Sequence, residues 1–397
     1  MSGSFYSIGF FGIPNYGDEL LCVSIRKGLS VLVPGATVYT STADPNISSS
    51  YSGIEREYLI PGLAPSRRYL RHWIRHLSIL RKSDLTLIGG GGLIADYYTW
   101  ASIVRYALDP IIGLAMGRKY VFVGIGARPI RRRWLRPLVR FFCRNASAVY
   151  ARDDDAAEAL RGNGCRDILV GPDLSVLSYP PVDFLETQEY ALVNVREKPF
   201  IDPRRIQDLC SALSGKFPEI VLLSAEMPDT TYYRQLVSSW PKDLQERIRI
   251  LEPKTLEEGH RTIGQARLVI AERLHVNVAA VQMQRPLGCI CYERKVSEFL
   301  EMLGCDAPRA DLNSVDGRLV VLAMEADSTV PDSRLGDTRR EAECVLSEVL
   351  TQARQAGKPR LWVRFQAIFW ATVLLGLCIV WSLASLAKSL VDRKDRS

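Results

Sequence analysis

The sequence has few of the residues that build metal and disulfide sites. Its 397 residues include nine cysteines without a C-x-x-C pair and four histidines, none at zinc-finger spacing. Neither a disulfide scaffold nor a structural zinc site is indicated, so we expect no metal and no cofactor. With 47% apolar and 24% charged residues, disordered and collagen-like chains are excluded. The N-terminus lacks a basic region before its first apolar run, and we expect no cleavable secretory signal.

Excess positive charge is confined to two stretches. The formal net charge is +7, and residues 66–82 and 128–144 together hold thirteen Lys and Arg residues and no acid. This distribution argues against a protein that coats nucleic acid and favours a localised anionic partner, either a phosphorylated ligand or lipid headgroups. Trp73 and Trp134 lie among the basic residues, so we expect both stretches to contact membrane lipid. The alternative is that the apolar residues pack on the body and the arginines are solvated.

Charge is absent from Ala367 to Ala387. As a helix this run is about 31 Å long, enough to cross a bilayer. Basic residues flank both ends, and Trp370 and Trp381 lie toward the ends, as is typical of membrane interfaces. We predict a single-pass anchor over residues 361–388, a short basic tail at 389–397 and a body in the cytoplasm; a buried core helix is the alternative.

The rest of the chain alternates short apolar runs with helical patterns, which predicts parallel α/β sheets. We expect an N-terminal domain over residues 1–181 and a second domain over 182–335, both doubly wound and Rossmann-like, meeting at a cleft. A connecting helix within 336–360 leads to the anchor. The expected strands are Phe5–Phe11, Thr37–Ser41, Glu57–Ile60, Thr86–Ile88, Tyr120–Ile125, Ala148–Ala151, Ile168–Val170, Ala191–Val195, Ile220–Ser224, Ile248–Leu251, Leu268–Ala271 and Leu287–Tyr292.

Three loops that follow predicted strands are unusual, and ligands of open α/β sheets collect at such loops. In the first, glycines permit close backbone approach before a helix whose N-terminus offers free N–H groups to an anion. The loop matches neither the G-x-G-x-x-G fingerprint nor a P-loop. Its candidate binding residues are Gly12, Asn15, Gly17 and Asp18, although Asp18 could instead cap the helix.

The second loop begins with four consecutive glycines and ends at Asp96. A glycine run in an ordered core indicates close contact with a ligand or another backbone. Gly90, Gly91 and Gly92 are therefore candidate binding residues, with a plain flexible turn as the alternative.

The third loop carries Glu272, Arg273 and His275. A guanidinium can hold a carboxylate or phosphate at two points, and a histidine can donate a proton near neutral pH. A lone histidine at a strand end is often structural, but its spacing from Arg273 and Glu272 favours a functional site.

Together these motifs resemble the polysaccharide pyruvyl transferase family. The resemblance covers about residues 5–304 and rests on G-I-P-N-Y-G-D-E, G-G-G-G-L-I-A-D, V-G-I-G, A-R-D-D-D-A-A-E-A-L with G-P-D-L, V-N-V-R-E, E-R-L-H and Y-E-R-K-V-S-E-F. It implies an architecture similar to B-type glycosyltransferases and transfer of pyruvate from phosphoenolpyruvate to a sugar as a ketal. It also implies a donor site containing Arg273, Leu274 and His275, with Asp96 and Arg152 matched in the first domain.

Phosphoenolpyruvate presents a carboxylate and a phosphate within a few atoms. Arg273, Arg152 or Arg196 could bind these groups while N–H groups of the glycine loops hold the phosphate. Ketal formation needs a proton on the methylene carbon and a deprotonated sugar hydroxyl, with His275 as candidate acid and Asp96 as candidate base. We expect the acceptor to be a sugar, or a lipid-linked glycan, of a cell-surface polysaccharide or its precursor.

Two other functions stay open from the sequence. The same cleft serves glycosyltransferases that use nucleotide sugars, because fold does not decide function. A non-catalytic scaffold that recruits glycan-assembly enzymes to the membrane is also compatible with the anchor.

Overall fold

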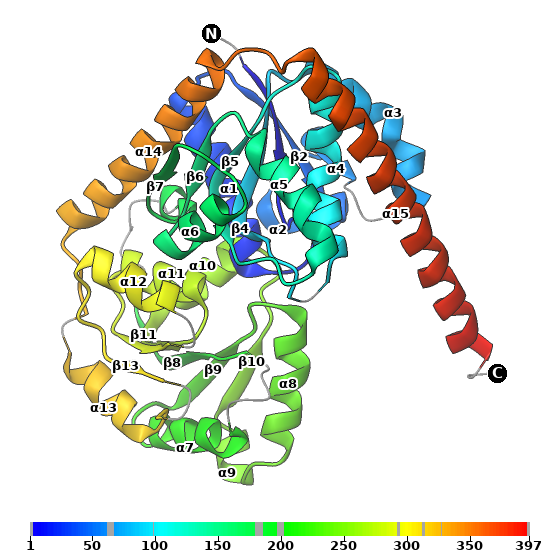
Figure 1. Ribbon diagram of the computed structural model, residues 1–397. Coiled ribbons are helices and arrows are strands. Elements are labelled where there is room, and N and C mark those ends of the chain that lie inside the picture. The colour runs from blue at the N-terminus through cyan, green and yellow to red at the C-terminus, as the bar shows by residue number, and fades with distance from the viewer. Residues whose placement is uncertain are drawn as a thin grey trace.

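The computed structural model describes residues 3–61, 67–97, 99–178, 186–196, 202–291, 294–311, 314–326 and 328–394. They form two α/β domains, each built on one parallel sheet, and a long C-terminal helix at the edge of the molecule (Figure 1). This confirms the predicted fold class of two Rossmann-like domains. The expected boundary between the domains, at residues 181 and 182, lies outside the described residues.

The first sheet has seven parallel strands in the order β3-β2-β1-β4-β5-β6-β7. The strands are β1 (Ser4–Ile8), β2 (Thr37–Thr42), β3 (Leu59–Pro61), β4 (Leu85–Ile94), β5 (Tyr120–Ala127), β6 (Val149–Ala151) and β7 (Ile168–Val170). The helical segments are α1 (Tyr16–Leu32), α2 (Pro45–Ser52), η1 (Arg56–Tyr58), α3 (Arg67–Lys82), α4 (Ala101–Ala115), η2 (Arg133–Leu135), α5 (Arg136–Arg144), α6 (Asp154–Gly162) and η3 (Leu174–Leu177). The central strands are continuous apolar runs because helices cover both faces of the sheet. All seven strands expected here are present.

The second sheet has six parallel strands in the order β10-β9-β8-β11-β12-β13. The strands are β8 (Gln188–Asn194), β9 (Glu219–Leu223), β10 (Ile248–Leu251), β11 (Ala266–Ala271), β12 (Leu287–Ile290) and β13 (Arg309–Ala310). The helices are α7 (Pro203–Ser214), α8 (Met227–Ser238), α9 (Lys242–Gln245), α10 (Leu256–Gln265), α11 (Leu274–Gln282), α12 (Arg294–Leu303) and α13 (Gly317–Glu325). The sequence prediction missed only β13, whose two residues give no periodic signal.

The chain then returns to the first domain. Helix α14 (Asp332–Gln355) packs along η3 and α1, with Leu346 against Gly28. Lys119 donates a hydrogen bond of 2.9 Å to the carbonyl of Ala356 just after α14. The segment expected to be a simple connecting helix is thus part of the wall of the first domain (Figure 1).

Helix α15 (Leu361–Lys394) follows, and its Leu361–Val380 portion is long and apolar enough to cross a membrane. It lies beside α4, and its C-terminal part extends beyond the body (Figure 1).

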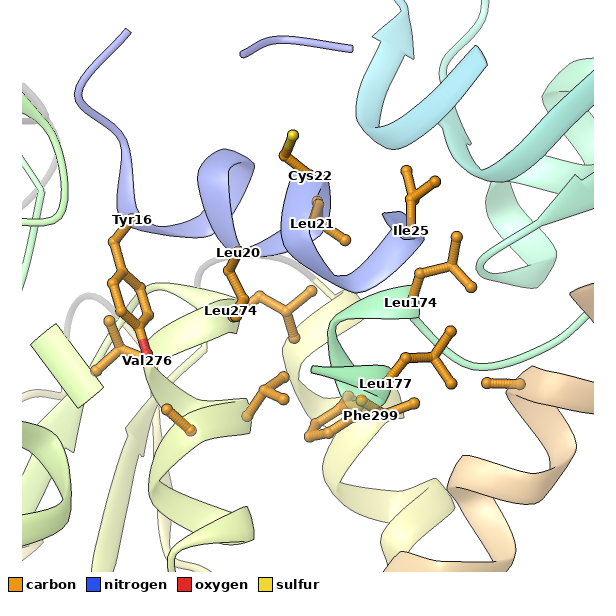
Figure 2. Packing of buried hydrophobic residues seen from close by; sticks show 14 of the residues in the cluster. Tyr16, Leu20, Leu21, Cys22, Ile25, Leu174, Leu177, Leu274, Val276 and Phe299 are labelled. Carbon is orange, nitrogen blue, oxygen red and sulfur yellow. The ribbon is translucent and has the colours of Figure 1, made fainter. Parts of the chain in front are cut away.

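A single hydrophobic cluster joins the two domains. Leu20 of the first domain lies close to Leu274 of the second, and Leu177 lies close to Phe299 (Figure 2). Burial of side chains of this size stabilises an arrangement by about 1.5–3 kcal/mol each. The two domains are therefore held together by apolar contacts between helices that follow the carboxyl ends of their strands.

The four glycines from Gly89 to Gly92 lie inside β4 rather than in a loop, so that expectation was wrong. Gly89 and Gly91 pair with β5, and the register shifts between Gly91 and Ile94. A Cβ at residue 89 would lie 1.7 Å from the carbonyl oxygen of Val123. Gly90 and Gly91 have φ values of 72° and 97°, a region that side chains disfavour. The run is explained by a bulged strand in close contact with its neighbours.

Candidate active site

The candidate site lies where the carboxyl ends of strands from both sheets face each other. The loop after β1 touches the loop after β9: the Tyr16 amide donates to the carbonyl of Ala225 at 2.9 Å, and the Asn15 side chain donates to the Glu226 carboxylate. Asn15 also caps α1 by accepting hydrogen bonds from the amides of Gly17 and Asp18, at 3.0 and 3.2 Å. One residue therefore starts the helix and fixes its N-terminus to the second domain.

His275 lies directly against the start of α1. A Cβ on Gly17 would be 2.0 Å from Nδ1 of His275, so only glycine leaves room for the ring at this position. The imidazole Nε2 is 3.7 Å from Oδ1 of Asp173, and the His275 side chain is 17% exposed. The histidine of the second domain thus meets a buried carboxylate of the first.

Asp173 also joins Arg152 to this pair. The Arg152 guanidinium lies 3.7 Å from Oδ2 of Asp173 and donates to Asp153 at 3.2 Å. It also lies against Gly126, where a Cβ would come within 3.0 Å of it. Burial works against ionisation of Asp173, but His275 and Arg152 outweigh it and hold its pKa well below the usual range. Asp173 is therefore an anion next to His275.

Arg273 is paired with two carboxylates of the second domain. Its guanidinium donates to Asp229 at 2.8 Å and to Glu226 at 3.0 Å. Burial would lower the Arg273 pKa, but Asp229 and Glu226 raise it above the ordinary value. Glu226 receives bonds from both Asn15 and Arg273, so the arginine takes part in the contact between the domains.

Arg196 and Glu272 form a second pair beside Arg273. Glu272 is fully buried, and it accepts hydrogen bonds from the Arg196 amide at 2.8 Å and from its Nε at 3.2 Å. The Glu272 amide donates to the carbonyl of Asn194. These bonds fix the loop after β8 next to the start of α11.

The Asp18 carboxyl lies near charged side chains of both domains. Burial raises the pKa of its carboxyl to about 8, and the negative charges of Glu226 and Glu19 add to the increase, while Arg273 and Arg152 oppose it. One of its oxygens would be 3.2 Å from a Cβ on Gly91. Asp18 is therefore largely protonated at neutral pH.

Several residues that were predicted to bind a ligand instead pack in the core or stabilise a turn of the backbone. Gly12 has φ 81°, packs against Thr42, and donates its amide to the buried Glu19. A Cβ on Gly90 would lie 2.9 Å from Leu21. Leu274 is part of the core between the domains (Figure 2). The neighbouring Gly92 is exposed, with open space around its Cα.

Asp96, expected as a catalytic base, anchors a loop. Its carboxylate is buried and accepts the amides of Arg131 and Arg132 at 3.0 and 2.7 Å. Burial opposes ionisation, but these two donors and the Arg132 guanidinium outweigh it and lower the pKa of Asp96. Both oxygens are engaged, which does not suit a group that must take a proton from a sugar hydroxyl.

Sequence reasoning missed Asp173, Glu226 and Asp229. The signals were present, because Asp173 follows β7 in a Gly-Pro-Asp turn, while Glu226 and Asp229 follow β9 as a capping box at the start of α8. The carboxyl ends of parallel strands share one edge of a sheet, so Asp173 was predictable on the edge that carries the glycine loop, and Glu226 and Asp229 on the edge that carries His275. Within the described residues, no group of three or more His, Cys, Asp or Glu side chains is placed to hold a metal ion.

The arrangement of two facing Rossmann-like domains is similar to that of sugar-nucleotide enzymes. The UDP-GlcNAc 2-epimerase of Methanocaldococcus jannaschii has 14% identity and a TM-score of 0.57, with 88% of this chain and 99% of that chain covered. The Neisseria meningitidis UDP-GlcNAc 2-epimerase bound to UDP-GlcNAc has 11% identity and a TM-score of 0.56, with 88% and 100% covered. Anabaena HepE in complex with UDP and glucose has 14% identity and a TM-score of 0.53, with 89% and 98% covered. At these identities the likeness defines the fold class alone.

A family model described as polysaccharide pyruvyl transferase matches residues 15–294, more than half of the chain. The chain therefore belongs to the polysaccharide pyruvyl transferase family, as the motifs indicated. The matched region begins at Asn15 and includes Arg152, Asp173, Arg273 and His275. The family implies a sugar or glycan as acceptor. A search among curated proteins finds no match.

Proposed function

We propose that this chain transfers a pyruvyl group from phosphoenolpyruvate to a sugar of a cell-surface polysaccharide or its precursor, forming a pyruvate ketal. The observation that supports it most is the contact of His275 with Asp173 and Gly17 at the junction of the two domains, inside a match to this family. The proposed catalytic acid thus has a carboxylate partner and lies in a place that both domains enclose.

His275 is the proton donor in this proposal. Its proton adds to the methylene carbon of phosphoenolpyruvate, and the positive charge that develops at C2 is captured by one sugar hydroxyl, whose proton passes to the now neutral imidazole. The C2–O bond to phosphate then breaks, a second hydroxyl of the same sugar closes the ketal, and the departing inorganic phosphate takes the proton of that hydroxyl. Asp173, ionised beside His275, stabilises the protonated imidazole before the transfer and orients the ring.

Donor binding falls to the arginines and to the helix N-terminus. The Arg152 guanidinium pairs with Asp153 and with His275's partner Asp173, and in this proposal it also holds the donor carboxylate or phosphate. The amides of Tyr16, Gly17 and Asp18 are bonded to Ala225 and Asn15, so α1 contributes the partial positive charge of its helix dipole at the same place. Arg273 pairs with Asp229 and Glu226, and Arg196 pairs with Glu272. In this proposal these two arginines position the loops that carry His275.

Phosphate release tests the proposal. The protein is incubated with phosphoenolpyruvate and glycan precursors, phosphate is measured, and the glycan is examined by mass spectrometry for an added pyruvate. Release of phosphate together with the ketal supports the proposal. Release of a nucleoside diphosphate from a nucleotide sugar would instead support a glycosyltransferase, and absence of phosphoenolpyruvate binding would support a scaffold.

The chain is proposed to attach to a membrane through α15, with the body in the cytoplasm. Helix α15 carries an uncharged run, and exposed Lys358 and Arg360 precede it. This position would bring the candidate site close to membrane-bound glycan precursors. Fractionation of cells expressing the full chain, with salt and detergent washes, tests the attachment.

A further inference from the structure

The inner side of α15 is docked on the first domain. Ala367 and Leu374 are fully buried, and Trp370 packs against Phe141 of α5 with ring centroids 6.2 Å apart. The Arg364 side chain donates a hydrogen bond of 3.1 Å to the carbonyl of Ala115, the last residue of α4. The contacts extend to Cys378, whose side chain is partly buried against the same cluster.

Helix α4 is built to be covered on the side that α15 occupies. Ten of its fifteen residues are buried, including the six consecutive residues from Tyr106 to Ile111. Six residues exceed one and a half turns, so every face of α4 is covered. A helix that packs on a sheet and is otherwise exposed keeps a polar outer face. The two apolar helices therefore complement each other (Figure 1).

The outer side of α15 is apolar as well. A docked helix of a soluble domain shows polar residues to solvent, whereas this one carries no charged side chain between Arg364 and Lys388. The exposed large side chains on it include Leu361, Trp362, Phe365, Ile368, Phe369 and Ile379. A contiguous exposed apolar surface of this kind marks an interaction site.

Basic and aromatic residues before α15 and elsewhere on the first domain fit an anionic bilayer. Arg354, Lys358 and Arg360 are exposed before the helix, and residues 354–366 contain no acid. Exposed Trp73 and Trp134 lie in α3 and η2, which belong to the same domain and flank exposed basic residues. Aromatic and basic side chains around an apolar helix face are typical of segments that lie in the headgroup region.

We propose that α15 lies in the plane of the membrane, with its inner side on α4 and its outer side in lipid, and attaches the first domain flat to an anionic bilayer. From Arg364 to Cys378 the docked length is about 21 Å of an apolar run of about 31 Å. A helix that crosses the bilayer has lipid on all sides over that length, which excludes docking on a domain built around a parallel sheet. The arrangement differs from the single-pass crossing that the length of the run alone predicts.

Two neighbouring residues on opposite sides of α15 test this arrangement. Ala367 is 0% exposed and Ile368 is 51% exposed, yet both lie at the same depth in the apolar run. The full-length Ala367→Arg and Ile368→Arg variants are compared for flotation with phosphatidylglycerol vesicles and for thermal unfolding. We expect I368R to bind vesicles at least about tenfold more weakly with an unchanged Tm, because it places a charge in lipid. We expect A367R to lower the Tm of the body, because it forces a charge into the contact with α4.

In a crossing helix the two variants would weaken membrane binding alike and leave the Tm of the body unchanged, and this result would overturn the proposal. If I368R changes self-association but not vesicle binding, the outer side is a protein interface and the proposal is also wrong. A C-terminal epitope tag gives a second readout in sealed proteoliposomes. Protease should reach the tag and the body from the same side, and a tag protected on the opposite side refutes the in-plane arrangement.

Discussion

The contact between Gly17 and His275 allows a sharp test of the proposed acid. A Cβ at residue 17 would lie 2.0 Å from Nδ1 and 2.8 Å from Cγ of the ring, whereas ordinary contact begins near 3.4 Å. Gly17→Ala therefore has to displace the imidazole by about 1.4 Å. Gly17 is the second residue of α1 and has no positive φ, so alanine fits the backbone and favours the helix by about 1 kcal/mol.

A displacement of about 1 Å at a reacting group costs about 100-fold in rate. We expect kcat for phosphate release from phosphoenolpyruvate to fall by about that factor in G17A, while the Tm and the donor affinity change little. Gly113→Ala in α4 is the matched control, because its Cβ would meet nothing closer than 3.5 Å. If G17A keeps more than about a third of the wild-type kcat, the position of His275 against α1 is irrelevant to catalysis.

Three further outcomes are expected. His275→Ala lowers kcat by about 100- to 10,000-fold with little change in donor affinity, because an acid acts in the transition state; a residual rate above about a tenth removes His275 from that role. Arg273→Lys raises the KM for the donor and lowers the Tm, because one ammonium cannot hold both Asp229 and Glu226. An unchanged KM together with an unchanged Tm would mean that the pairing of Arg273 with these two acids has no function. Asp18→Asn raises the Tm relative to wild type at pH 8, and the difference shrinks toward pH 4. Between pH 4 and pH 8 the carboxyl ionises in the unfolded chain, whereas in the folded protein its pKa is near 8 and it stays protonated. The wild type therefore loses stability as the pH rises. A Tm difference that does not depend on pH refutes this reasoning.

The sequence predicted the strands and helices well, because the spacing of apolar residues differs between the two. The strands from β1 to β12 are runs of apolar residues between helical segments, and a parallel sheet buried on both faces produces that pattern directly. The glycine run was misplaced for a physical reason. Glycine signals close approach of another atom, but the sequence does not say whether a ligand or a strand makes the approach, and here it is the backbone of β5.

The candidate site was predictable in part. His275 and Gly17 were both selected, but their direct contact depends on how the two domains face each other, which no local pattern contains. Asp96 was selected because of its place after the glycines, and only tertiary structure brings the amides of Arg131 and Arg132 to both its oxygens. Asp173 was missed for the complementary reason, since its importance comes from a histidine about a hundred residues away in the sequence.

The charges of the site set a condition on donor binding that single residues do not reveal. Among the residues that the structure describes, the acids Asp18, Asp173, Glu226 and Asp229 lie near the bases Arg152, Arg273 and His275. A phosphate ester that also carries a carboxylate would meet strong repulsion if all four acids were ionised. Burial keeps Asp18 protonated at neutral pH, which removes one negative charge at the point where α1 presents its amides. Because Arg273 is balanced by two carboxylates and Arg152 pairs with Asp153 and Asp173, the protonation of Asp18 lowers the repulsion that an anionic donor would meet at this site.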